Sequence, residues 1–231
     1  MRRTMLFMPG SKPGNLLNGD VYGADSIIID LEDAVALAEK DSARILTKHA
    51  MRTFHYDCEL IVRINSLTTP FWQDDLDMII PEKPDVIMPT KVYTAEDIRT
   101  IDAYITRIEE AHGMPVGGVK LIPLLETAAS IENAYEIAKA SPRMAGLYLG
   151  AADLSLDMKG TRTREGYDIA YARSRLVIAA RTAGIDALGE NRVQEMTAKL
   201  AEDAYRGAPL HFIGHLQRNK VKQVVGKVAL I

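Results

Sequence analysis

Short apolar runs alternate along the chain with longer segments in which apolar positions recur at helical spacing. Runs of about four to eight apolar residues are typical of strands buried in a parallel sheet, and the helical spacing is typical of amphipathic helices that cover it. The runs predict strands at residues 4–8, 26–33, 59–65, 85–89, 119–126, 146–153, 185–188 and 210–214. The segments between them predict helices at residues 36–53, 71–80, 94–112, 128–141, 168–182, 192–205 and 219–225. This alternation predicts a single α/β domain folded as a (β/α)8 TIM barrel.

Composition and charge narrow the range of partners. The 231 residues carry a formal net charge of −3, and 26% of them are charged, as in an ordinary globular protein. This charge argues against a nucleic-acid partner and against binding to a membrane surface. No apolar run reaches the length of a membrane span, no signal peptide is recognised, and a single cysteine, Cys58, cannot form an internal disulfide. We therefore expect a cytoplasmic protein. Cys58 precedes a predicted strand rather than following one, which makes it a poor candidate nucleophile.

The two central predicted strands, residues 119–126 and 146–153, each end on a lone carboxylate. The helix predicted between them completes a β-α-β unit, which places the carboxyl ends of both strands at the same edge of the sheet. Glu126 and Asp153 should then lie side by side at the mouth of the barrel, where barrel enzymes keep their chemistry. Two such carboxylates suit Mg²⁺, which leaves positions for water and substrate. The alternative is that they cap helix N-termini or anchor loops.

The ends of the other predicted strands supply further polar side chains to this mouth. They are Ser11, Lys12, Asp30, Glu32, Asp33, Arg63, Asn65 and Lys91. Acidic groups that suit a cation alternate with basic groups that suit an anion, which favours a small polycarboxylate held on a metal ion. Arg63 could clamp a carboxylate through two hydrogen bonds, or it could form an ion pair with Asp30 or Glu32. The Gly- and Pro-rich turn around Ser11 and Lys12 could hold a phosphate through main-chain N–H groups.

Five motifs follow one another at these strand ends. They read Phe7-Met8-Pro9-Gly10-Ser11-Lys12-Pro13, Ile29-Asp30-Leu31-Glu32-Asp33-Ala34-Val35, Val62-Arg63-Ile64-Asn65, Pro123-Leu124-Leu125-Glu126-Thr127 and Leu149-Gly150-Ala151-Ala152-Asp153-Leu154. In this order they resemble the citrate lyase β-subunit family, of HpcH/HpaI type, from Met1 to about Ala187.

The resemblance implies a Mg²⁺-dependent carbon–carbon (oxo-acid) lyase that acts on citryl or malyl thioesters carried by coenzyme A or an acyl carrier protein. It implies that Glu126 and Asp153 bind Mg²⁺ and that Arg63 binds the substrate, with oxaloacetate as the oxo acid in the citryl case. Further candidates for contact with substrate or carrier are Ser11, Lys12, Asn65 and Lys91. In relatives an acid near the C-terminal end, often on a neighbouring subunit, helps to protonate the enolate, so a homo-oligomer is also expected.

After about residue 187 the citrate lyase pattern stops. The chain continues with Leu188-Gly189-Glu190-Asn191-Arg192-Val193-Gln194-Glu195 and Leu210-His211-Phe212-Ile213-Gly214-His215-Leu216-Gln217-Arg218-Asn219-Lys220. These motifs resemble the pyridoxal-phosphate homeostasis family, a barrel of alanine-racemase type. The resemblance predicts a chimera, engineered or natural, that joins residues 1–187 of one barrel to residues 188–231 of another. The Schiff-base lysine and the phosphate loops of that second family have no counterpart here, so we expect no pyridoxal-phosphate (PLP) site.

Three hypotheses of function follow. The first is a chimeric barrel that keeps a Mg²⁺ and oxo-acid site but has weak or no lyase turnover, because the C-terminal acid is lost. The second is an active lyase of citryl or malyl thioesters, with Glu190 or His215 as proton donor. The third is a PLP-binding module. We favour the first. His211 and His215 could form a metal-binding pair, although strand and loop roles suit them better.

Overall fold

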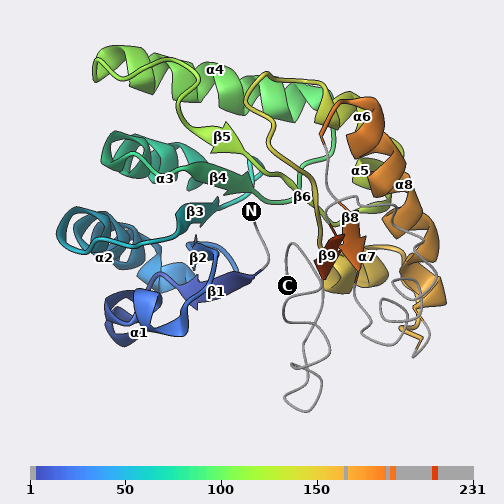
Figure 1. The fold of residues 1–231 in the computed structure, drawn as a ribbon, viewed down its shortest axis with the longest axis horizontal. Helices are drawn as coiled ribbons and strands as arrows, with labels where there is room; N and C mark the ends of the chain where they lie inside the picture. Colours follow the sequence, from blue (N-terminus) through green and yellow to red (C-terminus); the bar gives the residue numbers. More distant parts are fainter. Residues whose placement is uncertain (1–3, 164–165, 186–187, 191–209, 213–231) are drawn as a thin grey trace.

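The computed structural model describes residues 4–163, 166–185, 188–190 and 210–212 (Figure 1). The strands are β1 (Met5–Pro9), β2 (Ser26–Asp30), β3 (Glu59–Ile64), β4 (Val86–Pro89), β5 (Lys120–Leu121), β6 (Leu124–Leu125), β7 (Tyr148–Leu149), β8 (Leu188–Glu190) and β9 (Leu210–Phe212). The α-helices are α1 (Pro13–Leu17), α2 (Lys40–Thr53), α3 (Trp72–Ile79), α4 (Ala95–Ala111), α5 (Ala128–Glu132), α6 (Ala134–Ala138), α7 (Ala151–Asp157) and α8 (Ala170–Thr182). Short 3-10 helices are η1 (Gly19–Tyr22), η2 (Leu37–Glu39), η3 (Ile80–Glu82) and η4 (Tyr167–Ile169).

The strand pairings are all parallel, which places the carboxyl ends of paired strands at one edge. Strands β1 to β5 form one sheet in sequence order, β6 pairs with β7, and β8 pairs with β9. The register puts Pro9 opposite Asp30, and Asp30 opposite Arg63, so polar strand ends become neighbours. In Figure 1, helices α2, α3 and α4 lie outside the strands, and α6 and α8 continue this outer layer. The result is a TIM-barrel-like α/β fold, as the alternation of strands and helices predicts.

The predicted strand 119–126 is divided at Pro123 into β5 and β6. Ile122 still donates its N–H to the carbonyl of Ile87 at 3.1 Å, but proline has no N–H to continue the ladder. The carbonyl of Pro123 instead accepts the N–H of Tyr148 at 3.0 Å, on the other side of the break. The wall of the barrel therefore continues from β5 through Pro123 to β7. Among the described residues, no ladder joins β7 to β8 or β9 to β1.

The prediction for the sixth strand is wrong at its end. Strand β7 stops at Leu149, and Asp153 lies in the first turn of α7 rather than at a strand end. The segment after Gly150 is apolar enough to extend a strand, but alanine and leucine favour a helix equally well. The predicted helix 128–141 is divided at Asn133 into α5 and α6. The predicted helices 192–205 and 219–225 lie outside the described residues. Across the described ranges, no helix combines the length and apolarity needed to cross a membrane.

Apolar side chains form separate layers inside and outside the wall of strands. The inner cluster is made of strand residues and residues flanking them, with none from a helix: Ile28, Ile61, Val86, Met88, Ile122 and Leu124. A larger cluster lies between the strands and the covering helices. Neighbours on one strand, such as Ile61 and Val62, belong to different clusters because successive side chains point to opposite faces. This packing fixes the direction in which each strand end presents its polar residue.

A buried ion-pair network holds the loops that lead into β5 and β7. The Arg143 side chain is 1% exposed and donates to the carboxylate of Glu109 at 2.6 and 2.9 Å, and also to Asp102. It further donates to the carbonyl of Val119 at 3.0 Å. Glu109 is fully buried on α4 and accepts the N–H groups of Gly117 at 2.9 Å and Val119 at 3.1 Å. The network thus ties α4 to the strands that lead to Glu126 and Asp153.

Replacing Arg143 by methionine should lower the free energy of unfolding by about 3–5 kcal/mol, because Glu109 would keep a buried charge without its cation. Urea denaturation followed by circular dichroism measures this change. Arg99→Ala is the matched control, because its partner Glu96 is exposed, and it should cost less than about 1 kcal/mol. An equally small effect of R143M would show that the network does not hold these loops.

Candidate active site at the carboxyl ends of the strands

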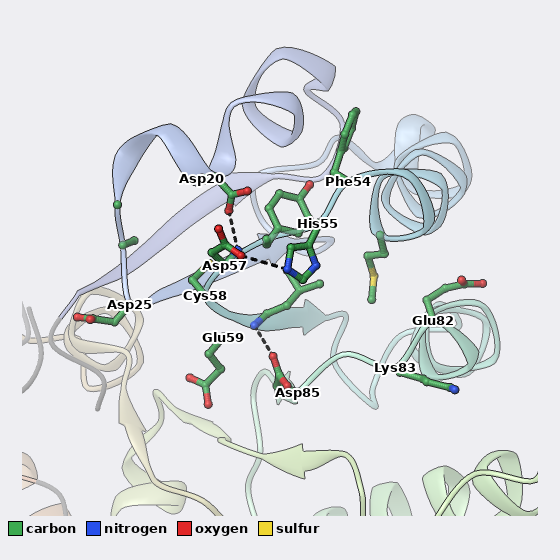
Figure 2. A pocket seen from close by; sticks show the side chains of 15 residues that line it. Asp20, Asp25, Phe54, His55, Asp57, Cys58, Glu59, Glu82, Lys83 and Asp85 are labelled. Atoms are coloured by element: carbon green, nitrogen blue, oxygen red, sulfur yellow. Dashed lines mark hydrogen bonds and ion pairs between the residues drawn. The ribbon is translucent and has the colours of Figure 1, made fainter.

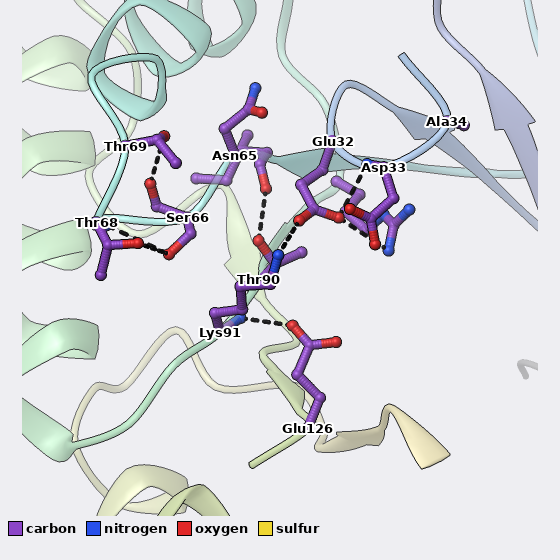
Figure 3. A network of polar contacts seen from close by, with 12 residues as sticks. Glu32, Asp33, Ala34, Asn65, Ser66, Thr68, Thr69, Thr90, Lys91 and Glu126 are labelled. Atoms are coloured by element: carbon purple, nitrogen blue, oxygen red, sulfur yellow. Dashed lines mark hydrogen bonds and ion pairs between the residues drawn. The ribbon is translucent and has the colours of Figure 1, made fainter. Parts of the chain in front are cut away.

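Glu126, directly after β6, is the most buried carboxylate of the predicted metal pair, with 2% of its surface exposed. Its Oε1 accepts the main-chain N–H of Lys91 at 2.8 Å (Figure 3). Gly150 packs directly against it: a Cβ at Gly150 would lie 2.6 Å from the Cβ of Glu126 and 2.9 Å from its Oε2. Only glycine at this position leaves the carboxylate where it is.

Asp153 is half-buried in the first turn of α7, and its charge acts on Glu126. The pKa of Glu126 is raised to about 7, chiefly because burial disfavours the charged carboxylate. The hydrogen bond from Lys91 lowers this pKa, while the negative charges of Asp153 and Glu32 raise it. Glu126 therefore lies beside other negative charges, and among the described residues the nearby Lys91 offsets them only in part.

This pair of carboxylates fits a divalent cation. Its hard oxygen ligands suit Mg²⁺, which commonly binds one or two protein carboxylates and completes its octahedron with water and substrate oxygens. In the described part of the chain, no group of three or more His, Cys, Asp or Glu side chains is arranged to hold a metal ion. Of the alternative roles, loop anchoring applies in part, since Glu126 holds the loop at Lys91. The N-cap position of α7 is occupied by Gly150, so Asp153 is not the N-cap residue.

Arg63 forms ion pairs with Asp30 and Glu32, which is the alternative role that the sequence analysis gives it. Its guanidinium donates to both oxygens of Asp30, with Nε at 2.7 Å, and its Nη1 lies 3.3 Å from Oε2 of Glu32. The ring of Phe7 lies beneath it, 5.2 Å from ring centroid to guanidinium carbon. Asp30 also accepts the N–H groups of Glu32 at 2.8 Å and Ala34 at 3.0 Å, which shapes the turn after β2. Arg63 is thus fixed at the mouth with 11% of its side chain exposed.

Lys91 connects Glu32, which is paired with Arg63, to Glu126. Its Nζ donates to Oε1 of Glu32 at 2.8 Å, while its N–H donates to Glu126 (Figure 3). The hydrogen bond to Glu32 raises the pKa of the lysine, although partial burial acts against this. Arg63, Glu32, Lys91 and Glu126 therefore form a continuous series of contacts around the mouth.

The other predicted binding residues are placed less directly. Asn65 is buried, and its side-chain amide donates to Asp75 at 2.7 Å and to the carbonyl of Leu31 at 3.1 Å, so its donors are used within the fold. The hydroxyl of Ser11 is buried and has no hydrogen-bond partner among the described residues, and Lys12 is exposed. A role in binding substrate or carrier stays a prediction for all three.

Two residues that support the site carry no clear signal in the sequence. Gly150 makes the close approach to Glu126 described above, and a glycine before a helix suggests nothing more than a turn. Lys40 is buried at the start of α2 and donates to the carbonyls of Leu31 at 2.8 Å and Glu32 at 2.6 Å. Burial lowers the pKa of Lys40, and the charge of Glu32 opposes this. Its partners, Leu31 and Glu32, directly follow strand β2, so sequence spacing alone does not reveal the contact.

The predicted proton donors stay untested. Glu190 is the last residue of β8, where the structure describes the main chain alone, and His215 lies outside the described residues. His211 lies in β9, so the strand role predicted for it agrees with the structure, while its pairing with His215 is also untested.

A polar cavity of about 1050 Å³ lies at the opposite, amino ends of the strands (Figure 2). Its lining includes Tyr56 and Cys58. Burial raises the pKa of Cys58 to about 11, which keeps the thiol protonated and agrees with its poor prospects as a nucleophile. Burial likewise raises the pKa of Tyr56 to about 12.

Comparison with known proteins identifies the class to which this fold and site belong. A family model described as HpcH/HpaI aldolase/citrate lyase matches residues 3–219, and the chain belongs to this family. The citrate lyase subunit beta of Leuconostoc mesenteroides subsp. cremoris is 46% identical over 188 residues, which cover 81% of this chain and 62% of the relative. An L-malyl-CoA/beta-methylmalyl-CoA lyase of Cereibacter sphaeroides is 37% identical over 204 residues, covering 79% of this chain and 64% of the relative. The chain thus spans less than two thirds of these curated relatives.

A solved structure described as citrate lyase beta subunit complexed with oxaloacetate and magnesium, from M. tuberculosis, is also similar. It superposes with a TM-score of 0.71 at 25% identity and covers 96% of this chain and 95% of the other. The predicted citrate lyase family is confirmed. These matches lend no support to a fusion with a PLP homeostasis protein, and the family match runs across the proposed junction at residues 187–188. The chimera stays a prediction.

The raised pKa of Glu126 predicts that Mg²⁺ affinity depends on pH. Below about pH 7 the carboxyl is protonated, and a proton must leave before the cation binds, so affinity should fall roughly tenfold per pH unit. Isothermal titration calorimetry between pH 8 and pH 5.5 measures this dependence. Glu126→Gln should bind weakly at every pH. Constant affinity of the wild-type chain over this range would exclude Glu126 as a ligand.

Proposed function

We propose that this chain is a Mg²⁺-dependent carbon–carbon lyase, or the corresponding subunit of a larger enzyme. Its substrate is a citryl or malyl thioester, which it cleaves to an acetyl thioester and a small oxo acid. The proposal rests on one observation: the buried Glu126 and the nearby Asp153 share a mouth with the fixed Arg63 cluster. The oxaloacetate and magnesium named for the M. tuberculosis structure support the choice of ligand class.

The charges at the mouth indicate how an oxo acid binds. Arg63 and Lys91 already face Asp30 and Glu32, so these four charges balance. An oxo dicarboxylate alone would bring two uncompensated negative charges toward Glu126, at a high cost in a partly buried site. A complex of the same anion with Mg²⁺ is neutral. We therefore propose that the oxo acid binds together with the metal and not before it.

Glu126 and Asp153 would hold Mg²⁺, which when bound supplies a Lewis acid for the hydroxyl and carboxylate that become the oxo acid. In the reaction the hydroxyl loses its proton and becomes a carbonyl as the neighbouring carbon–carbon bond breaks. The electron pair of that bond passes to the α-carbon of the thioester, which becomes an enolate, and a proton added at this carbon gives the acetyl thioester. Arg63 stabilises negative charge on the oxygens while the bond breaks. Its hold on Asp30 and Glu32 fixes this charge before the substrate arrives.

The proton for the enolate has several candidate sources. Glu190, His215 and an acid from a neighbouring subunit stay proposals, as do a homo-oligomer and a coenzyme A or acyl-carrier-protein thioester as substrate. The buried hydroxyl of Ser11, which follows β1 and has no partner in the described part of the chain, is a candidate contact for the carrier.

A second candidate is the chimeric barrel, which binds Mg²⁺ and the oxo acid but turns over weakly or not at all. The two motifs after residue 187 favour it, and so does the extent of the citrate lyase β-subunit match, 188 of 231 residues. The family match to residue 219 favours the active lyase, which we prefer.

Binding and turnover measured on the same chain test both candidates. Mg²⁺ and oxaloacetate together should raise the melting temperature, whereas oxaloacetate with a chelator should not, and Asp153→Asn should abolish the effect. At a ligand concentration about 100 times Kd, the stabilisation should be about 2.7 kcal/mol. Citryl-CoA or malyl-CoA should release its oxo acid in the presence of Mg²⁺. Arg63→Lys should lower kcat/KM about 10²-fold, because lysine cannot reproduce the bidentate geometry.

Each result separates the candidates. Binding with turnover supports the lyase, and binding without turnover of either thioester supports the chimera. A wild-type chain that melts cooperatively but ignores Mg²⁺ and oxaloacetate would contradict both.

A further inference from the structure

Lys91 follows β4 with a left-handed main-chain conformation, at a φ of 49°. Non-glycine residues seldom adopt it, and proteins retain it where the surroundings hold it, often at functional sites. Two hydrogen bonds hold it here. The hydroxyl of Thr90 donates to the carbonyl of Ile64 at 3.2 Å, and the N–H of Lys91 donates to Glu126 at 2.8 Å. The main chain is thereby shaped to direct an N–H group at the buried carboxylate.

The side chain of Lys91 reaches in another direction, to Oε1 of Glu32. Glu32 follows β2 and Lys91 follows β4, with β3 between them in the sheet, so this ion pair spans the end of β3 (Figure 3). The second carboxylate oxygen of Glu32 faces Arg63, which lies near the carboxyl end of β3. Glu32 is 7% exposed, forms ion pairs with these two cations, and also accepts the N–H of Asp33 at 2.9 Å.

We propose that Lys91 is a positioning residue that sets the separation between the Arg63–Glu32 ion pair and the carboxylate of Glu126. Its N–H orients Glu126 for the cation, and its ammonium ion holds Glu32 against Arg63. This inference rests on the proposed function. Without the ammonium ion of Lys91, Glu32 would keep Arg63 as its one ion-pair partner among the described residues, and the arginine would be drawn away from the substrate carboxylate.

A competing role is direct contact between the lysine and the substrate, as the sequence suggests. The Lys91 side chain is 39% exposed and could reach an anion at the mouth. Both roles predict that loss of the ammonium ion weakens oxo-acid binding. They differ in whether that loss depends on the charge of Glu32, which a double-mutant cycle measures.

The experiment is calorimetry of oxaloacetate binding at saturating Mg²⁺, with the folded state of each variant checked by its melting curve. Lys91→Met should weaken oxaloacetate binding about 10–100-fold, as loss of a residue that orients metal ligands does elsewhere. Lys91→Arg should recover most of it. In a Glu32→Gln background, where no charge at residue 32 needs holding, K91M should change affinity less than about threefold. Should K91M fail to fold, Lys91→Gly suits the left-handed conformation, keeps the N–H and removes the same charge.

Lys83 is the matched control, since it too is left-handed, with a φ of 60°, and lines the cavity at the opposite end of the strands. Lys83→Met should leave oxaloacetate affinity unchanged. A full effect of K91M in the E32Q background would overturn the proposal in favour of direct substrate contact. No effect of K91M on its own would reduce Lys91 to a structural role. A wild-type chain that does not bind oxaloacetate would remove the proposed function and this inference together.

Discussion

The ion pair between Arg63 and Asp30 sets the arrangement of the rest of the mouth. The two residues are register partners on β3 and β2, so the parallel ladder itself brings them together. Asp30 is 1% exposed and uses its remaining hydrogen-bonding capacity on the main chain of Glu32 and Ala34. One carboxylate therefore orients the arginine and also shapes the turn that presents Glu32. Since a buried charge without its partner is costly, neither residue can change alone.

The second constraint is steric and lies around Glu126. The main chain approaches it closely at Gly150, and Lys91 adopts a left-handed conformation beside it. Neither arrangement favours stability by itself: glycine adds flexibility to the unfolded chain, and left-handed lysine is strained. Together they hold a buried carboxylate near a second one, where its pKa rises to about 7. Proteins commonly keep such unfavourable local features where the chemistry requires them.

The gathering of these residues at one edge could be predicted from sequence, because apolar runs identify strands and parallel strands share a carboxyl edge. Which side chain contacts which could not be predicted in this way. For Arg63 the sequence leaves two roles open, a clamp on a substrate carboxylate and an ion pair with Asp30 or Glu32; it pairs with both acids, which depends on the twist and register of β2 and β3. Pro123 could have indicated the break between β5 and β6, but the apolar residues around it predict one continuous strand.

The sequence predicts the edge of the sheet at which Asp153 lies, but it predicts a strand end where the structure has the first turn of a helix. An apolar segment beginning with Gly-Ala-Ala fits a strand end or a helix start, and the structure shows a helix whose N-cap, Gly150, packs against Glu126. Lys40 and Gly150 act through residues of other elements, and neither periodicity nor spacing reports on such contacts. Composition and pattern therefore define the edge and its chemical character, while tertiary packing defines which charge faces which.

Carboxylates at the two ends of the strands behave differently, and hydrogen bonding explains why. At the amino ends, around the cavity of Figure 2, Asp85 accepts the N–H of Leu60 at 2.7 Å and Asp20 accepts that of Asp57 at 3.1 Å. These groups satisfy main-chain donors at the start of β3 and remain near solvent, so their charge needs no further partner. Glu126 is more deeply buried and accepts one main-chain N–H in the described structure. Its remaining need is for positive charge, and Asp153 beside it increases that need. The same functional group, a carboxylate, thus stabilises the fold at one end and, in the proposed function, holds a dication at the other.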